Sequence, residues 1–375
     1  MAPAQLVHVA FMDDASHFVA STAAGSHVFS CNSLKRMLHK PEFTGAEVAS
    51  AGLLGPSMPN SLAVVTRRRP SNKSGGVEEE GRPVVHDYAI HHWVWGQTNG
   101  GKPLVLNPSG AVRGVRLLGD HMLVAGEEKA ALYDVHGHRE KEVSTGPNPL
   151  GLCAMALGAG RTRTLVYALP MPVPKGAVQV CRRGRPGSVV EVRAHGAAVS
   201  CLALSPDARL LATASSRGTL VRIFSTADRA KLQELRRGSD RADIHCIAFS
   251  SDSKCLAVSS DKATVHVFPV TVNGIASSMP EDDGVLLPPV PSVPSPAPAK
   301  ANEGSSRLSF LKGYLPSYFG PKRSLAQFRL PEGTKYLVAF PPQHQHPCNV
   351  LIVGMDGSFS RCVFDPVEGG ATQQG

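Results

Sequence analysis

The chain has 375 residues, 42% hydrophobic and 18% charged, so it has the composition of a globular protein with enough apolar material for a core. Its formal net charge of +9 favours an anionic partner: nucleic acid, a phosphoinositide membrane or an acidic protein surface. The N-terminus lacks a secretory signal pattern, and no window approaches the ~18 apolar residues of a membrane-spanning helix. We therefore expect a soluble, unsecreted chain whose membrane contacts are peripheral.

The N-terminal segment has the pattern of one unit of a β repeat. Three short apolar runs, LVHVAF, HFVAST and SHVFSC, lie within residues 6–31 and predict three short strands. They align with a later repeat, with Phe11 on Phe249. Residues 34–58 are predicted to be a loop or a poorly defined outer strand.

The next three units are less regular. SLAVVTRRR at 61–69 begins a second unit, which HDYAIHHWVW and KPLVLN continue. Residues 69–83 are a polar surface insertion, because charge runs among Gly, Ser and Pro are usually solvated loop. Residues 111–135 predict three strands of a third unit, and NPLGLCAMAL opens a fourth, followed by RTLVYAL, AVQVCRR and SVVEVRA.

Two later segments are copies of each other. SPDARLLATASSRGTLVRIF (205–224) and SSDSKCLAVSSDKATVHVF (250–268) match with an offset of 45 residues, which places Leu211 on Leu256. A period near 45 with three short apolar runs per copy is typical of a β-propeller blade. The Trp-Asp dipeptide of WD40 blades is absent, so the prediction relies on strand periodicity.

After the second copy the pattern stops and then resumes. Residues 271–306 are rich in Pro, Ser and Ala and cannot build a core. SLAQFRL (324–330) then supplies the missing outer strand of blade six, and residues 336–364 supply a seventh blade.

The predicted fold class is all-β, a seven-bladed β-propeller of degenerate WD40 repeats with a long disordered insertion in blade six. Residues 1–375 form one domain. Within it, 271–323 are a membrane-facing loop insertion and 369–375 a flexible tail.

The sequence predicts no enzyme. It contains no GxSxG, HExxH or P-loop, and its eight cysteines form no CxxC pair. We expect the cysteines to be small buried residues in a reducing cytosol. His91-His92 and His344/His346 lack partners at ligand spacing, so neither a metal nor a cofactor is expected.

The candidate chemistry centres on Leu235-Arg236-Arg237-Gly238, between the two copies. The twin arginines end the predicted outer strand of blade five. Because alternate strand residues point to opposite faces, each arginine is expected at the rim of a different groove between blades. A phosphate monoester needs guanidinium groups plus several short-range donors, and Ser, Thr and His residues surround the pair. The alternative is a solvated pair with hydroxyls that serve the turns, and composition alone favours it.

The motif carries a family resemblance. LRRGSDRADIHCIAFSSDSKCLAVSSDKATVHVF resembles the PROPPIN family, the WD-repeat propellers that bind polyphosphoinositides and act in autophagy, whose hallmark is a Phe/Leu-Arg-Arg-Gly motif here. ATASSRGTLVRIF, NPLGLC and SFLKGYLPSYF followed by SLAQFRLPE are also similar to family segments, the last most of all to plant autophagy-related 18-type members.

The resemblance implies two phosphoinositide sites on the propeller rim. The first would use His195, Ser200, Ser215, Thr219, Arg222 and Arg236. The second would use Arg237, Ser260, Thr264 and His266. Two positions depart from the family pattern: Ala263 replaces a usual Gly, which weakens the second site slightly, and Arg323 replaces a frequent Trp.

The insertion contains a candidate membrane anchor. Its apolar residues fall close to helical spacing between basic flanks, a pattern typical of an interfacial helix that orders on a membrane. The predicted membrane-insertion residues are Leu308, Phe310, Leu311, Tyr314, Leu315 and Tyr318. The alternative is a staple that packs on the propeller.

These observations and the resemblance imply a cytoplasmic protein that binds phosphatidylinositol 3-phosphate and phosphatidylinositol 3,5-bisphosphate. It would recruit autophagy machinery, with a lipid-transfer or conjugation protein as partner, at phagophore, endosomal or vacuolar membranes. We expect a monomer in solution that binds no nucleic acid. The main alternative is a protein-interaction scaffold without lipid recognition. RNA binding is weaker, because aromatic residues do not interleave the basic ones.

Overall fold

The computed structural model describes most of the chain outside its loops and insertions. The described residues are 6–43, 48–53, 60–68, 87–94, 104–108, 110–160, 163–184, 189–271, 322–342, 349–365 and 371–374. The described strands belong to one compact unit, Met1–Thr271 with Lys322–Gly375, and Val272–Pro321 counts as a separate one. Within the described ranges, no helix is long and apolar enough to cross a membrane.

The strands form seven four-stranded antiparallel sheets, each built from strands in chain order. The first two blades are β1 (Leu6–Phe11), β2 (His17–Thr22), β3 (Gly25–Ser30) and β4 (Arg36–Lys40), then β5 (Val48–Leu53), β6 (Asn60–Arg68), β7 (Asp87–Val94) and β8 (Leu104–Leu106). Blades three and four are β9 (Val112–Leu118), β10 (His121–Gly126), β11 (Lys129–Asp134) and β12 (Arg139–Ser144), then β13 (Ala154–Leu157), β14 (Leu165–Pro170), β15 (Ala177–Arg182) and β16 (Val189–Arg193).

The remaining three blades follow the same plan. Blade five is β17 (Val199–Leu204), β18 (Leu210–Ser215), β19 (Leu220–Ser225) and β20 (Lys231–Arg236). Blade six is β21 (Ile244–Phe249), β22 (Cys255–Ser260), β23 (Thr264–Pro269) and β24 (Ala326–Arg329). Blade seven is β25 (Tyr336–Ala339), β26 (Asn349–Gly354), β27 (Phe359–Phe364) and β28 (Ala371–Gln374).

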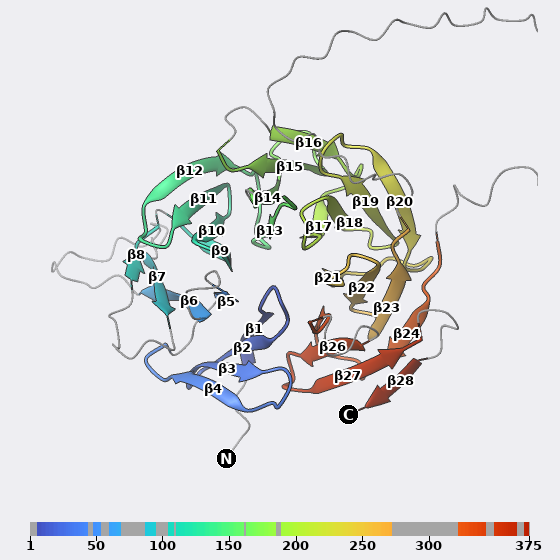
Figure 1. The fold of residues 1–375 in the computed structure, drawn as a ribbon, viewed down its shortest axis with the longest axis horizontal. Helices are drawn as coiled ribbons and strands as arrows, with labels where there is room; N and C mark the ends of the chain where they lie inside the picture. The colour runs from blue at the N-terminus through green and yellow to red at the C-terminus, as the bar shows by residue number, and fades with distance from the viewer. Residues whose placement is uncertain are drawn as a thin grey trace, which may run out of the picture. The chain divides into compact units, whose positions relative to one another are not determined.

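The seven sheets close into a ring through the first strand of each blade. Each first strand contacts the first strand of the next blade, and β25 contacts β1 (Figure 1). Arg361 of blade seven joins the ends of the ring, because one guanidinium nitrogen donates to the carbonyls of Cys31 at 3.0 Å and Asn32 at 3.3 Å. The predicted seven-bladed propeller is confirmed.

The core consists of layers between neighbouring blades. Along each strand alternate side chains face opposite neighbours, so every blade supplies apolar residues to two layers. Val178 and Val192 of blade four pack with Leu211 of blade five in one such layer. Val265 of blade six packs with Val350 of blade seven in another.

Blades five and six repeat each other in local detail as well. In the turn after the first strand, the Ser205 hydroxyl donates to the Asp207 carboxylate at 2.5 Å, and Ser250 does the same to Asp252 at 2.7 Å. This hydrogen bond fixes each turn where the chain reverses. The aspartates at corresponding positions are therefore explained by turn geometry.

Four strands lie where the sequence analysis expected none or was indefinite. Residues 34–58 hold β4 and β5, so blade two begins at Val48 and not at residue 61. Strand β12 is missing from the predicted third blade, and its sequence REKEVS is mostly exposed, so no apolar alternation marks it. Within the predicted flexible tail 369–375, β28 pairs with β27 through Arg361–Phe364. Pairing at an open sheet edge satisfies backbone groups without an apolar pattern, which explains why β28 was missed.

The insertion starts and ends on the outer strand of blade five. At its start, the Gln233 side chain donates to the Pro269 carbonyl at 2.9 Å and accepts from the Thr271 amide at 3.1 Å. At its end, the Lys322 amide donates to the Glu234 carbonyl and the Lys322 carbonyl accepts from the Arg236 amide, both at 2.9 Å. The Lys322 ammonium also contacts the Thr271 hydroxyl. Strand β24 then pairs with β23, as predicted for the outer strand of blade six.

Candidate functional site

The two arginines of the LRRG motif face different blades. In the β19–β20 register Leu220 lies opposite Arg236 and Arg222 lies opposite Glu234, so these four side chains share one face. That face looks towards blade four, because the Arg222 guanidinium donates to the Ala194 carbonyl at 2.7 Å. Arg237 is the next residue and lies close enough to His266 of blade six to lower the pKa of that imidazole.

The groove towards blade four contains an ion pair and a neutral imidazole. Nε of Arg222 donates to the Glu234 carboxylate at 2.8 Å. The His195 imidazole is hydrogen bonded to the Thr213 hydroxyl at 3.0 Å. Burial, and secondarily the Arg222 charge, lowers the pKa of His195 to about 4. At neutral pH this groove therefore presents two guanidinium groups, one carboxylate and an uncharged imidazole.

The hydroxyl residues proposed for the first site are spread across the blade. Ser200 lies on β17 and its hydroxyl donates to the Ala214 carbonyl at 3.5 Å. Ser215 ends β18, and its hydroxyl accepts from the Arg217 amide at 3.4 Å. Because neighbouring strands are about 4.8 Å apart, β17 and the outer strand β20 are separated by roughly 14 Å. Ser200 therefore lies three strand spacings from Arg236. Thr219, just before β19, lies beside the Arg236–Arg237 backbone, and its carbonyl accepts from the Arg237 amide at 2.9 Å.

The groove towards blade six is more closed. Arg236 is exposed, but the side chain of Arg237 is only 7% exposed. Nε of Arg237 donates to the Gly218 carbonyl at 2.9 Å, and Nη2 donates to the Asp240 carbonyl. The burial of Arg237 contradicts the expectation that both arginines lie at the rim. Its two hydrogen bonds also join the β18–β19 turn to the connection between blades five and six.

The blade-six residues of the second site share one face. Ser260, Thr264 and His266 all lie on β22 or β23, and Nδ1 of His266 is hydrogen bonded to Ser324 at 3.3 Å. Burial, and secondarily the Arg237 charge, lowers the pKa of His266 to about 4. Ser260 is 1% exposed, whereas Thr264 is half-buried.

Several residues of these grooves were missed by sequence reasoning. Glu234 pairs with Arg222, and its position two residues before Arg236 would have placed it on the same face by strand alternation. Ser324, the partner of His266, lies far along the chain and carried no sequence signal.

The other residues singled out in the sequence analysis were assigned to neither phosphoinositide site. Within the part of the chain that the structure describes, no cluster of three or more His, Cys, Asp or Glu side chains fits a metal ion. His91 bonds to the Thr66 hydroxyl at 3.1 Å, and His92 is buried. The polar insertion 69–83, His344, His346 and the membrane-insertion residues lie outside the described residues.

Comparison with known proteins gives the family. The PROPPIN family model matches residues 92–286. Autophagy-related protein 18e of Arabidopsis thaliana is 32% identical over 98% of this chain and 85% of its own length. Among solved structures, Kluyveromyces lactis Hsv2 superposes with a TM-score of 0.68 at 20% identity, covering 99% of this chain and 97% of that one. A complex of KlAtg21 with the coiled coil of AgAtg16 gives a TM-score of 0.64 at 17% identity, covering 99% and 98%. The chain belongs to the PROPPIN family.

Proposed function

We propose that this PROPPIN is a peripheral membrane protein that binds phosphatidylinositol 3-phosphate and phosphatidylinositol 3,5-bisphosphate through the two grooves beside β20. It brings autophagy machinery to membranes where autophagosomes form, and it acts without catalysis. The single observation that carries the proposal is that Arg236 and Arg237 face different grooves, each of which also holds a neutral imidazole, half-buried in His195 and buried in His266.

The chemistry of each groove suits a phosphate monoester. A guanidinium group supplies charge-assisted donors, and a neutral imidazole or a hydroxyl supplies further donors for the remaining oxygens. In the first groove the ligand set is His195, Thr219, Arg222 and Arg236, with Ser200 and Ser215 further inside the blade. In the second it is Arg237, Ser260, Thr264 and His266.

The base of the insertion supports membrane attachment at the same edge. Thr271 and Lys322, the described residues on either side of 272–321, are both held on β20, the strand that ends in Arg236. An interfacial anchor in that segment would follow a residue held on the strand that ends in Arg236, directly before Arg237. Its apolar residues would be Leu308, Phe310, Leu311, Tyr314, Leu315 and Tyr318. Headgroup recognition and attachment to the membrane would then both take place beside strand β20.

The partner is proposed to be a protein of the autophagy lipid-transfer or conjugation machinery. Support comes from the similarity to autophagy-related protein 18e and from the fold shared with KlAtg21, which forms a complex with the coiled coil of AgAtg16. The places of action are proposed to be phagophore, endosomal and vacuolar membranes.

Vesicle flotation tests headgroup recognition against simple charge attraction. One vesicle contains phosphatidylinositol 3-phosphate, and the other contains phosphatidylserine adjusted to equal surface charge. The protein should float with the first vesicle and remain unbound with the second at physiological salt, because exposed charge attraction alone is screened within about 8 Å. Equal flotation on both vesicles would show that the basic chain binds charge without recognising the headgroup. No flotation on either would favour a protein scaffold.

A further inference from the structure

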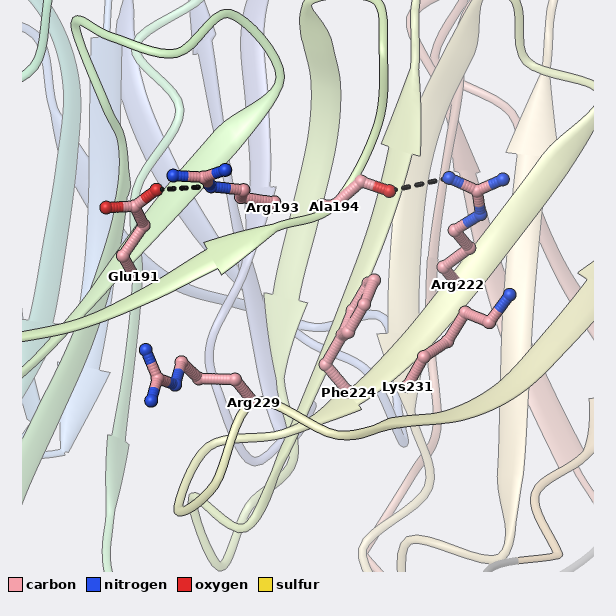
Figure 2. A pocket seen from close by; sticks show the side chains of 7 residues that line it. All are labelled: Glu191, Arg193, Ala194, Arg222, Phe224, Arg229 and Lys231. Atoms are coloured by element: carbon pink, nitrogen blue, oxygen red, sulfur yellow. Dashed lines mark hydrogen bonds and ion pairs between the residues drawn. The ribbon is translucent and has the colours of Figure 1, made fainter. Parts of the chain in front are cut away.

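A basic pocket lies between blades four and five, at the opposite end of β19 from Arg236. Its volume is about 560 Å³, and Figure 2 shows the side chains that line it. They are Glu191, Arg193, Ala194, Arg222, Phe224, Arg229 and Lys231. Arg222 also belongs to the first groove, whereas Arg193, Arg229 and Lys231 have no place in either proposed phosphoinositide site.

The pocket carries a surplus of positive charge. Four cationic side chains line it, and the nearby carboxylates are Glu191, which pairs with Arg193 at 2.9 Å, and Glu234, which is shared by Arg222 at 2.8 Å and Lys231 at 3.6 Å. No acidic partner is recorded for Arg229 among the described residues. An anion in the pocket would relieve the repulsion among these cations.

The turn that presents Arg229 is fixed against blade four. Arg182 of β15 donates to the Thr226 carbonyl at 3.0 Å, across the boundary between the blades. Arg229 has φ of 69°, and the equivalent turn of blade one carries Leu34 at 55°. This turn position therefore requires a left-handed backbone conformation, which does not require an arginine. The backbone geometry of the turn does not account for the positive charge of Arg229.

The cations occupy two sides of the pocket. In Figure 2, Arg193 and Arg229 lie on one side of the Phe224 ring, and Arg222 and Lys231 lie on the other. Phe224 is buried and forms an apolar floor between them. A single phosphate group would pair with the cations on only one side of the ring. The pocket volume lies within the ~300–1,000 Å³ range of small-molecule sites.

We propose that this pocket is a third anion site, which binds a compact ligand carrying at least two phosphate monoester groups, one against each pair of cations. Such a ligand is either a polyphosphorylated inositol headgroup in a membrane or a soluble polyphosphate. The site goes beyond the two grooves of the proposed function and needs neither Arg236 nor Arg237.

Calorimetry in a background with both grooves weakened tests the proposal. The background is the full chain with Arg236→Ala and Thr264→Asp, which removes the exposed arginine of one groove and puts a carboxylate into the other. Titration with inositol hexakisphosphate at physiological salt should show one bound equivalent. Adding Arg229→Asn and Lys231→Gln should weaken binding at least tenfold, because both sides of the pocket lose a cation. Asn tolerates the left-handed turn position.

A matched control separates a site from general charge. Lys175→Gln with Arg241→Gln removes two exposed cations outside the pocket and should leave the affinity unchanged. Flotation of the background variant on phosphatidylinositol 3,5-bisphosphate vesicles identifies the source of the ligand. If flotation is lost on adding Arg229→Asn and Lys231→Gln, the ligand is a membrane headgroup. If these changes weaken only the binding of inositol hexakisphosphate, the ligand is a soluble compound. Equal losses in the pocket and control variants, or no binding of either probe, would overturn the third site. None of these outcomes bears on flotation of the wild-type chain by phosphatidylinositol 3-phosphate, which tests the proposed function separately.

Discussion

Arg236 and Arg237 are adjacent in sequence but differ in their surroundings. Arg236 is exposed at the end of β20, whereas Arg237 is buried and donates to two backbone carbonyls. A buried charged donor that is removed leaves its acceptors without partners, and a hydrogen bond to a charged group contributes about 1.5–3 kcal/mol. The second arginine therefore stabilises the blade, and in the proposed second site it would in addition bind phosphate.

This difference predicts unequal effects on stability. Arg237→Ala should lower the free energy of unfolding by on the order of 2–3 kcal/mol, because the Gly218 and Asp240 carbonyls lose their donor. Arg236→Ala should change it by less than ~0.5 kcal/mol, as for most exposed substitutions. Urea denaturation of both variants measures the difference. Equal stabilities would show that the buried contacts of Arg237 contribute nothing.

At the scale of one element, the β22–β23 turn is shorter than its counterpart in blade five and is strained. Ala263 has φ of 48°, a left-handed conformation, where blade five has Gly218 at 63°. A Cβ in this conformation costs roughly 1–2 kcal/mol. The departure from the family pattern noted in the sequence therefore falls on a position that favours glycine.

Ala263→Gly should relieve that strain. The gain is partly offset by about 0.4–1 kcal/mol, because glycine gives the unfolded chain more freedom. The net expectation is a stabilisation of up to ~1 kcal/mol, measured as a higher urea midpoint with an unchanged slope. Ala242→Gly is the matched control, since Ala242 is also buried but is not among the residues with positive φ, and it should destabilise. A loss of stability in Ala263→Gly of the same size as in the control would refute strain at this turn.

At the scale of the whole molecule, burial of neutral histidines makes folding sensitive to acid. The pKa values of His195 and His266 fall from 6.5 to about 4, and burial also lowers the pKa of five other described histidines. Those five are His17, His27, His92, His121 and His245. In the unfolded chain all seven imidazoles bind protons more readily than in the folded chain. Their contribution to the free energy of unfolding is therefore full above pH 6.5 and is lost as the pH falls towards 4.

Thermal unfolding should therefore occur at progressively lower temperature between pH 6.5 and about 5. The free energy of unfolding should fall over this range by roughly 1–2 kcal/mol for each of His195 and His266. Asp13 has the opposite effect on stability, because desolvation of its carboxyl group raises its pKa to about 6. His266→Gln should reduce the slope of stability against pH. An identical slope in wild type and variant would exclude His266 as a contributor.

The sequence was sufficient for the fold because apolar periodicity survives in most strands. Strand β18 is buried along its whole length and β22 at all but its first residue, and both repeat with their turns, so residues 205–268 defined the blade. Outer strands β12 and β28 were missed because strands at a sheet edge need backbone pairing but no apolar pattern. The opposite faces of Arg236 and Arg237 followed from strand alternation. Burial of Arg237 did not, because it depends on carbonyls contributed by separate turns.

The central claim is that two grooves, one on each side of β20, bind phosphoinositide independently. The direct test compares flotation on phosphatidylinositol 3-phosphate vesicles for wild type, Arg236→Ala, Thr264→Asp and the double variant. Thr264→Asp places a carboxylate on the same face of β23 as His266, where it competes with phosphate for Arg237. Each single variant should float less than wild type, by about tenfold or more at its own groove, and the double variant should not float. If one single variant abolishes all flotation while its melting temperature stays that of wild type, or if the double variant floats like wild type, the two-groove account is contradicted.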